Sequence, residues 1–316
     1  MSQINRLLVS RGPALVTYRG GKFFSKADIA IDLSKKTKAI PSSAYGDLDE
    51  VVEGVENTLK FTPVGEFEHL SVLFPYAETL PGQSIFGTAD APLLIQPLDT
   101  TQPQITFHAA AISKMPDLNF AATETLFGDV EFSFVGKNNT ATDAADYYFT
   151  SANNALTGAS PYDPDALIVQ AYDLAWGLIE PFDSFNSREG VKVSFSLKTT
   201  ADTADAIGVY DKIFSSLGVT ASLIPSGITE ADLLTAAAVQ GAESVRGRKL
   251  SASGRDLNIT GDGVYFRIYR AGIRKSQLVY GSEKQRIAPV EFVASRSVGA
   301  GGTLNPLFYI GTAAPV

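Results

Sequence analysis

The chain has 316 residues, of which 45% are hydrophobic and only 19% are charged, so it can form about two globular domains with cores of their own. Its net charge of −8 disfavours a dedicated nucleic-acid binder, because such proteins gain affinity by neutralising phosphates. The absence of cysteine excludes disulfides, thiol catalysis and cysteine-based zinc sites. The low charge content suits either a protein that buries its surface against partners or a β-protein with uncharged polar loops.

The amino terminus lacks a charged region followed by a long apolar run, which predicts no signal peptide. No stretch approaches the roughly 20 apolar residues of a membrane helix, so we expect a soluble protein without a membrane partner. The charge is uneven, because residues 246–296 hold eleven Lys and Arg but four Asp and Glu. Such a basic segment on an acidic chain could steer a head-to-tail contact between copies or be a set of solvated strand faces.

The first half of the chain has the pattern of a sheet. Short apolar or alternating segments, bounded by Gly and Pro, predict strands at residues 13–18, 27–33, 55–61, 93–95, 105–109 and 130–135. We expect a polar loop over residues 34–53, which is long for a connection between strands and would reach a neighbouring subunit. The helical spacing of Phe67, Leu70 and Phe74 predicts one short helix over residues 66–76.

The second half repeats motifs of the first half in the same order. The proposed matches pair residues 54–61 with 190–197, 105–107 with 264–266, 110–114 with 271–275, and 130–132 with 290–292. The first match is followed by a helical candidate in each half, at 66–76 and 206–217. A duplication predicts that residues 10–136 superpose on 166–299, with the two Val-Glu-Phe segments in equivalent strands.

The repeat defines the expected architecture. The fold class is mainly β with a few helices (α+β), as two tandem β-sandwich or barrel-like domains, each flanked by a helix. The domains span residues 1–160 and 161–316, joined through a small, polar stretch near 137–166 in which residues 147–149 pack down. A helical insertion near 229–240 lengthens the second domain, with Thr229 and Asp232 capping its start and Gly241 its end.

No motif in the sequence indicates an enzyme. The two histidines, His69 and His108, lie among apolar neighbours and predict half-buried structural side chains. The frame around Ser84 fails as a nucleophile elbow because Phe86 and Gly87 are out of register with Gly-x-Ser-x-Gly, and no phosphate-binding glycine motif occurs. We expect residues 260–263 to form a hairpin turn. We predict no catalytic, cofactor-binding or metal site and no cofactor.

Carboxylate-pair hydrolysis stays open at this point, because two acids that are distant in sequence can meet in a fold. The candidates are Asp163 with Asp165, or Asp183 near Trp176. A chain with one tryptophan is a poor sugar-binding protein, so this reading is disfavoured.

With the repeat established, residues 12–29, 61–66, 73–76 and 305–310 resemble the tail tube proteins of long-tailed bacteriophages. The resemblance is one of general pattern. It implies a β-sandwich or barrel-like domain with a helix, whose copies form rings that stack into a hollow tube. Some members carry the domain twice, so that three chains make a pseudo-hexameric ring. The duplication fits that arrangement.

The resemblance also implies the partners and the location. The chain would bind itself as a homotrimer and contact other tail proteins in the virion, after synthesis in the host cytoplasm. DNA would pass through an acidic lumen during ejection without sequence-specific binding. The alternative is another β-rich virion component, such as a tail adaptor or decoration protein, or a carbohydrate-binding module.

Overall fold

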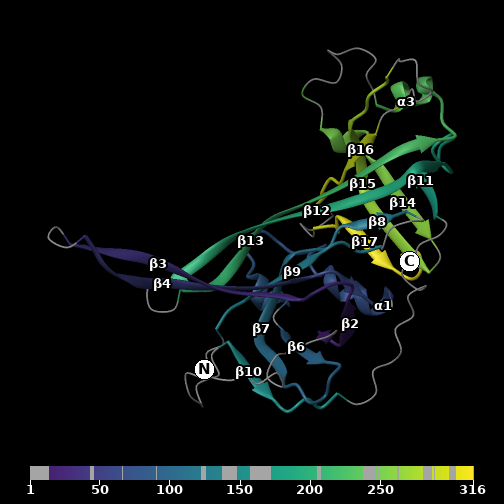
Figure 1. Ribbon diagram of the computed structural model, residues 1–316. Helices are drawn as coiled ribbons and strands as arrows, with labels where there is room; N and C mark the ends of the chain where they lie inside the picture. Colours follow the sequence, from purple (N-terminus) through teal and green to yellow (C-terminus); the bar gives the residue numbers. More distant parts are fainter. Residues whose placement is uncertain are drawn as a thin grey trace.

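The protein is mostly β, and its strands form two antiparallel sheets (Figure 1). The computed structural model describes residues 14–42, 46–65, 67–89, 91–121, 126–136, 148–156, 172–204, 208–237, 247, 249–261, 263–279, 287, 289–298 and 304–315. The mainly β class predicted from the sequence is therefore confirmed.

The first sheet has the strand order β3-β4-β9-β7-β6-β1-β2-β5, and β10 pairs with β7. Its strands are β1 (Ala14–Tyr18), β2 (Gly21–Ser25), β3 (Ala30–Ser42), β4 (Gly46–Phe61), β5 (Pro63–Val64), β6 (Ala91–Pro97), β7 (Gln104–Lys114), β9 (Val130–Phe134) and β10 (Phe149–Ala152). The predicted strands near residues 13–18, 93–95, 105–109 and 130–135 all lie in this sheet.

The second sheet has the order β11-β14-β15-β16-β13-β12-β8, and β17 pairs with β15. Its strands are β8 (Leu118–Phe120), β11 (Tyr172–Trp176), β12 (Asn186–Ala204), β13 (Gly208–Ser226), β14 (Arg255–Gly261), β15 (Val264–Lys275), β16 (Val290–Val293) and β17 (Phe308–Gly311). Strand β8 comes from the first half of the chain, so the two halves share backbone hydrogen bonds. The predicted turn at residues 260–263 falls where β14 ends at Gly261 and β15 begins at Val264; Gly263 has a φ of 71°, and residue 262 lies outside the described residues.

Helices are few and short. They are α1 (Phe67–Leu70), the 3-10 helix η2 (Ser71–Leu73), α2 (Ile85–Ala89), α3 (Glu230–Ala236) and the 3-10 helix η5 (Leu250–Ala252). The helix expected over residues 66–76 is present in shorter form as α1 and η2. The capping box of Thr229 and Asp232 at the start of α3 is confirmed, whereas Gly241 lies outside the described residues.

The two sheets repeat one strand order. Reading β3-β4-β9-β7-β6-β1 in the first sheet and β12-β13-β16-β15-β14-β11 in the second gives the same succession of antiparallel neighbours. The extra strands match as well, because Phe149 of β10 faces Phe107 of β7 and Phe308 of β17 faces Ile268 of β15. A repeat therefore exists at the level of sheet topology.

The Val-Glu-Phe segments occupy equivalent places in equivalent strands, as predicted. Ile112 faces Phe132 and Lys114 faces Glu131, with an irregularity between the two pairs. In the second sheet Ile273 faces Phe292 and Lys275 faces Glu291, with the irregularity at the same step. A shared register that includes the same β-bulge supports a true internal duplication.

A buried aromatic donor fixes each sheet in the same way. The Tyr18 hydroxyl donates to the Ala110 carbonyl at 3.5 Å, and the Trp176 indole donates to the Ala271 carbonyl at 2.7 Å. Tyr18 also packs edge-on against Phe132 at a centroid distance of 4.9 Å, as Trp176 does against Phe292 at 5.4 Å. The two rings are each buried and each hydrogen-bonded, as buried Tyr and Trp usually are.

Two of the matches proposed from the sequence are wrong in register. Residues 54–61 lie in β4, the second strand of its hairpin, whereas residues 190–197 lie in β12, the first strand of the other hairpin. The true counterpart of β4 is β13, since Leu59 faces Phe132 and Ala221 faces Phe292. Likewise Phe107 corresponds to Ile268, since they face Leu93 and Leu257, so the match of 105–107 with 264–266 is shifted by two residues.

The helix predicted over residues 206–217 is also wrong, because residues 208–217 belong to strand β13, while residues 206 and 207 lie outside the described residues. Of the three irregularities in the pairing of β12 with β13, two lie near Tyr210 and Ser215. Each bulge adds a residue and breaks the alternation of faces, which leaves Val209, Ile213 and Leu217 at a spacing that imitates a helix. The helix α3 is likewise no insertion, because it lies between β13 and β14 as α1, η2 and α2 lie between β4 and β6.

The predicted polar loop is mostly strand, and only part of the predicted linker is described by the structure. Residues 34–53 are mostly strand, in a long hairpin of β3 and β4 whose lysines and Pro41 had the composition of a loop. Of the predicted linker, residues 137–147 and 157–171 lie outside the described residues. Phe149 packs on Phe107 at a centroid distance of 5.9 Å, which confirms that part of this stretch packs down.

Candidate assembly interface

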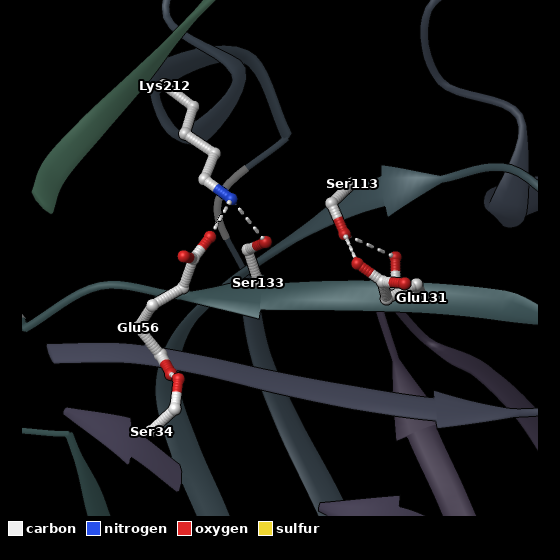
Figure 2. A network of polar contacts seen from close by, with 6 residues as sticks. All are labelled: Ser34, Glu56, Ser113, Glu131, Ser133 and Lys212. Carbon is white, nitrogen blue, oxygen red and sulfur yellow. Dashed lines mark hydrogen bonds and ion pairs between the residues drawn. The ribbon is translucent and has the colours of Figure 1, made fainter. Parts of the chain in front are cut away.

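The long hairpin of β12 and β13 leaves the second sheet and packs on the first one (Figure 1). Near its tip the Lys212 ammonium donates to Glu56 of β4 at 3.2 Å and to the Ser133 hydroxyl of β9 at 2.9 Å (Figure 2). The Lys212 side chain is only 12% exposed. A base that is largely removed from water in this way is satisfied by its two acceptors, as a buried charge must be.

Backbone groups tie the same hairpin to the loop before α2. The Gly82 amide donates to the Phe214 carbonyl, and the Phe214 amide donates to the Gln83 carbonyl, both at 2.8 Å. The Ser84 hydroxyl donates to the Asp211 carboxylate at 2.6 Å. The first half thus extends the hairpin by a short segment of strand-like pairing.

Phe214 anchors this junction. Its side chain is fully buried and lies 6.2 Å from the Tyr76 ring, centroid to centroid. The Arg296 guanidinium stacks over the Phe214 ring at 5.7 Å and donates to the Thr79 carbonyl at 2.8 Å. Burial lowers the pKa of Arg296 from its ordinary value. An aromatic side chain that fills a pocket under an arginine is typical of the centre of an interface.

The hydrophobic cores of the two halves also meet away from the hairpin. Val191 of β12 faces Phe120 of β8 in the ladder. Phe74 lies 5.2 Å from Phe195 and 6.2 Å from Phe308, centroid to centroid. The buried apolar residues of both halves form one cluster, so the two halves share a continuous hydrophobic core.

The hairpin of β3 and β4 has no such cover among the described residues. Every side chain from residue 30 to residue 41 is exposed, and Figure 1 shows the two strands projecting far from the rest of the molecule. Large apolar side chains lie on it in the open, among them Leu33, Val51 and Val52, with exposures of 54%, 50% and 48%. The exposed strand edges of a ribbon of this kind can pair with another chain.

The exposed hairpin and the docked hairpin are copies of one another. The exposed hairpin has two irregularities in its pairing, between Lys36 and Thr37 and between Ile40 and Pro41. The docked hairpin has irregularities at the two corresponding steps of β12 and a third one outside the matched range, between Ser187 and Val191. Residues 30–61 therefore match residues 192–223 without a gap. Identical pairs are Ser34 and Ser196, Lys36 and Lys198, Thr37 and Thr199, Ala39 and Ala201, Ala44 and Ala206, Gly46 and Gly208, Asp49 and Asp211, and Thr58 and Thr220.

This match assigns a counterpart to each residue that docks. Glu50 stands where Lys212 stands, and Val52 stands where Phe214 stands. The local geometry is the same, because the Glu50 amide donates to the Asp49 carboxylate at 2.8 Å and the Lys212 amide donates to the Asp211 carboxylate at 2.7 Å. The exposed hairpin is therefore shaped like one that binds a sheet.

The residues considered for hydrolysis do not form a site in the described part of the chain. Asp163 and Asp165 lie outside it. Asp183 is exposed, while Trp176 is buried under the Arg255 guanidinium at 5.0 Å and serves as a core side chain. His69 and His108 are half-buried, as predicted.

Other features that a search for chemistry would use are few in the described ranges. These residues contain no group of three His, Asp or Glu side chains placed to hold a metal ion. A pocket of about 380 Å³ opens between η2 and β17, lined mostly by apolar side chains such as Phe74 and Phe308, with Glu78 as its carboxylate. Among the helices that the structure describes, none has the length and apolarity needed to cross a membrane.

Comparison with known proteins gives no relative: no protein-family model matches the chain, and no curated protein matches its sequence.

Proposed function

We propose that the protein is a structural subunit that binds copies of itself to form rings, and that these rings stack into a hollow tube like the tail tube of a long-tailed bacteriophage. One observation carries the proposal. The hairpin of β12 and β13 docks on the first sheet of its own chain, whereas the equivalent hairpin of β3 and β4 is exposed. The second sheet of another copy is the surface that this exposed hairpin fits.

The contact is heterologous, because the hairpin and the surface that receives it are different parts of the molecule. Such head-to-tail contacts generate a ring when the rotation closes and a filament when it does not. Three chains would supply six sheets in a pseudo-hexameric ring, each sheet with its helical segment acting as a barrel-like domain.

Six sheets, each giving roughly four strands, would supply the many-stranded wall that a DNA channel needs. Duplex DNA is about 20 Å across, and the diameter of a β-barrel grows with the number of its strands. The long hairpins of β3 with β4 and of β12 with β13 would contribute strands to this wall, because a closed wall covers the strand edges that each hairpin leaves open alone. The acidic chain would repel DNA and let it slide.

In this proposal the partners are further copies of the chain, other tail proteins and passing DNA, and the place of action is the virion tail. Electron microscopy of the purified protein in negative stain tests it. Rings or long hollow rods support the proposal. A protein that stays monomeric at high concentration and low salt would overturn it and would favour a decoration protein, a tail adaptor or a carbohydrate-binding module.

A further inference from the structure

The two equivalent hairpins carry opposite charges at the position that docks. Lys212 of the docked hairpin meets Glu56 and Ser133 of the first sheet. Its counterpart on the exposed hairpin is Glu50, an acid in place of a base. Because both bulges are shared, the two side chains leave their hairpins on the same face.

The surfaces that receive the hairpins differ in the complementary sense. In the first sheet Ser113 lies at the bulge of β7 and donates to Glu131 at 3.0 Å, on the same side of β9 as Lys212 (Figure 2). The register places Arg274 of β15 at the corresponding bulge of the second sheet. The Arg274 side chain pairs with Glu291 and is still 55% exposed.

The acid that Lys212 binds is also missing from the second sheet. Glu56 of β4 corresponds to Gly218 of β13, and Ser133 of β9 corresponds to Val293 of β16. A lysine docked there would meet an arginine and no carboxylate except Glu291, which is already paired. An acid docked there meets an arginine with exposed surface.

We infer that Glu50 of one copy pairs with Arg274 of the next, and that this pair is the specificity determinant of the contact between chains. The inference rests on the proposed ring. The reversed charges make each hairpin fit one sheet: Lys212 fits the first, within a chain, and Glu50 fits the second, between chains. Glu50 on a first sheet would face Glu56, and like charges brought together at an interface disfavour the wrong partner. Because each hairpin fits only one of the two sheets, the two halves of the chain alternate around the ring.

A double-mutant cycle on the full-length chain tests the pair. Glu50→Gln removes the acid, and Arg274→Ser installs the residue that the first sheet has at this place. We expect each single variant to raise the critical concentration for assembly, measured by sedimentation, by about tenfold at low salt. The double variant should be no worse than either single one, because both break the same contact.

A charge exchange gives the second readout. Glu50→Arg and Arg274→Glu alone should each block assembly, and the two together should restore it. Asp183→Asn, which removes one acid from the turn after β11, is the matched control and should assemble as the wild type does. Urea unfolding of each variant at a concentration where it is monomeric separates a folding defect from an assembly defect.

The inference and the proposed function fail in different ways. If the wild type assembles and the losses of the two single variants add in the double variant, the pair is refuted while the ring stands. Normal assembly of Glu50→Gln would refute it equally. If the wild type forms no assembly under any of these conditions, the proposed function itself is overturned.

Discussion

The position shared by Phe214 and Val52 gives a matched pair of substitutions, of which one should weaken the fold of the monomer and the other should weaken assembly. Phe214 is fully buried at the junction between the two halves, and truncation of a buried Phe to Ala costs about 3–5 kcal/mol of unfolding free energy. About 0.5–1.5 kcal/mol of this belongs to the ring contact with Tyr76. Val52 is 48% exposed, so Val52→Ala removes about two half-buried carbons, worth about 0.8 kcal/mol.

Urea unfolding of the monomer, followed by the fluorescence of Trp176, measures both losses. The chain has one tryptophan, and it is buried in the second sheet. Phe214→Ala should lower the midpoint strongly, and Val52→Ala should leave it almost unchanged while raising the critical concentration for assembly. A loss below about 1 kcal/mol for Phe214→Ala would refute the view that hairpin docking holds the halves together. An equal loss for both variants would refute the equivalence of the hairpins in their different surroundings.

Three further outcomes are expected. Lys212→Ala should destabilise the monomer by about 1–3 kcal/mol, measured by urea unfolding, because two acceptors lose their donor. Deletion of residues 36–47 should leave a folded chain that no longer polymerises in negative stain, and normal tubes from this variant would show that the exposed hairpin has no part in assembly. The hydrogen bond from Thr62 lowers the pKa of Asp129. The ionised Asp129 therefore contributes stability above the ordinary Asp pKa, and this contribution is lost as the pH falls through the lowered pKa. Asp129→Asn should therefore reduce the fall of the melting temperature at acid pH, and an unchanged fall would show that Asp129 does not contribute to it.

The sequence pattern was sufficient to predict the β class, most first-sheet strands and the repeat of the Val-Glu-Phe segments. These segments are half-buried strands in which Glu131 and Glu291 alternate with buried neighbours, and such alternation is the most direct sequence signature of a strand. The capped start of α3 was equally readable, because a capping box is a local arrangement of Thr229 and Asp232.

The equivalence of the hairpins is hard to see in the sequence, because β3 is exposed along residues 30–41 whereas β12 and β13 bury side chains such as Phe195 and Phe214, so the two hairpins differ in apolar pattern. A signal was nevertheless present: Ser-x-Lys-Thr occurs at residues 34–37 and again at 196–199. The repeat is obscured because residues 34–53 have the lysines and proline of a loop, and because the bulges of β13 give residues 206–217 the spacing of a helix. These identical short segments are the sequence signal for the gapless match of residues 30–61 with residues 192–223.

The docking of one hairpin on the other half was beyond sequence reasoning. Lys212 and Glu56 are 156 residues apart, and no local sequence feature of either segment indicates that the two segments meet. The pair becomes visible only when the fold brings β13 against β4. The same limit applies to Glu50 and Arg274, whose proposed contact joins two different chains.

The number of chains in the assembled ring decides whether the two halves of the chain act as equivalent units. Native mass spectrometry of isolated rings, together with image averages computed without imposed symmetry, gives this number. The account predicts three chains arranged with pseudo-sixfold symmetry, each exposed hairpin of β3 and β4 lying on the second sheet of its neighbour. Rings of six full chains would contradict the pairing of the two halves as equivalent units. A stable monomer at high concentration and low salt would contradict assembly itself.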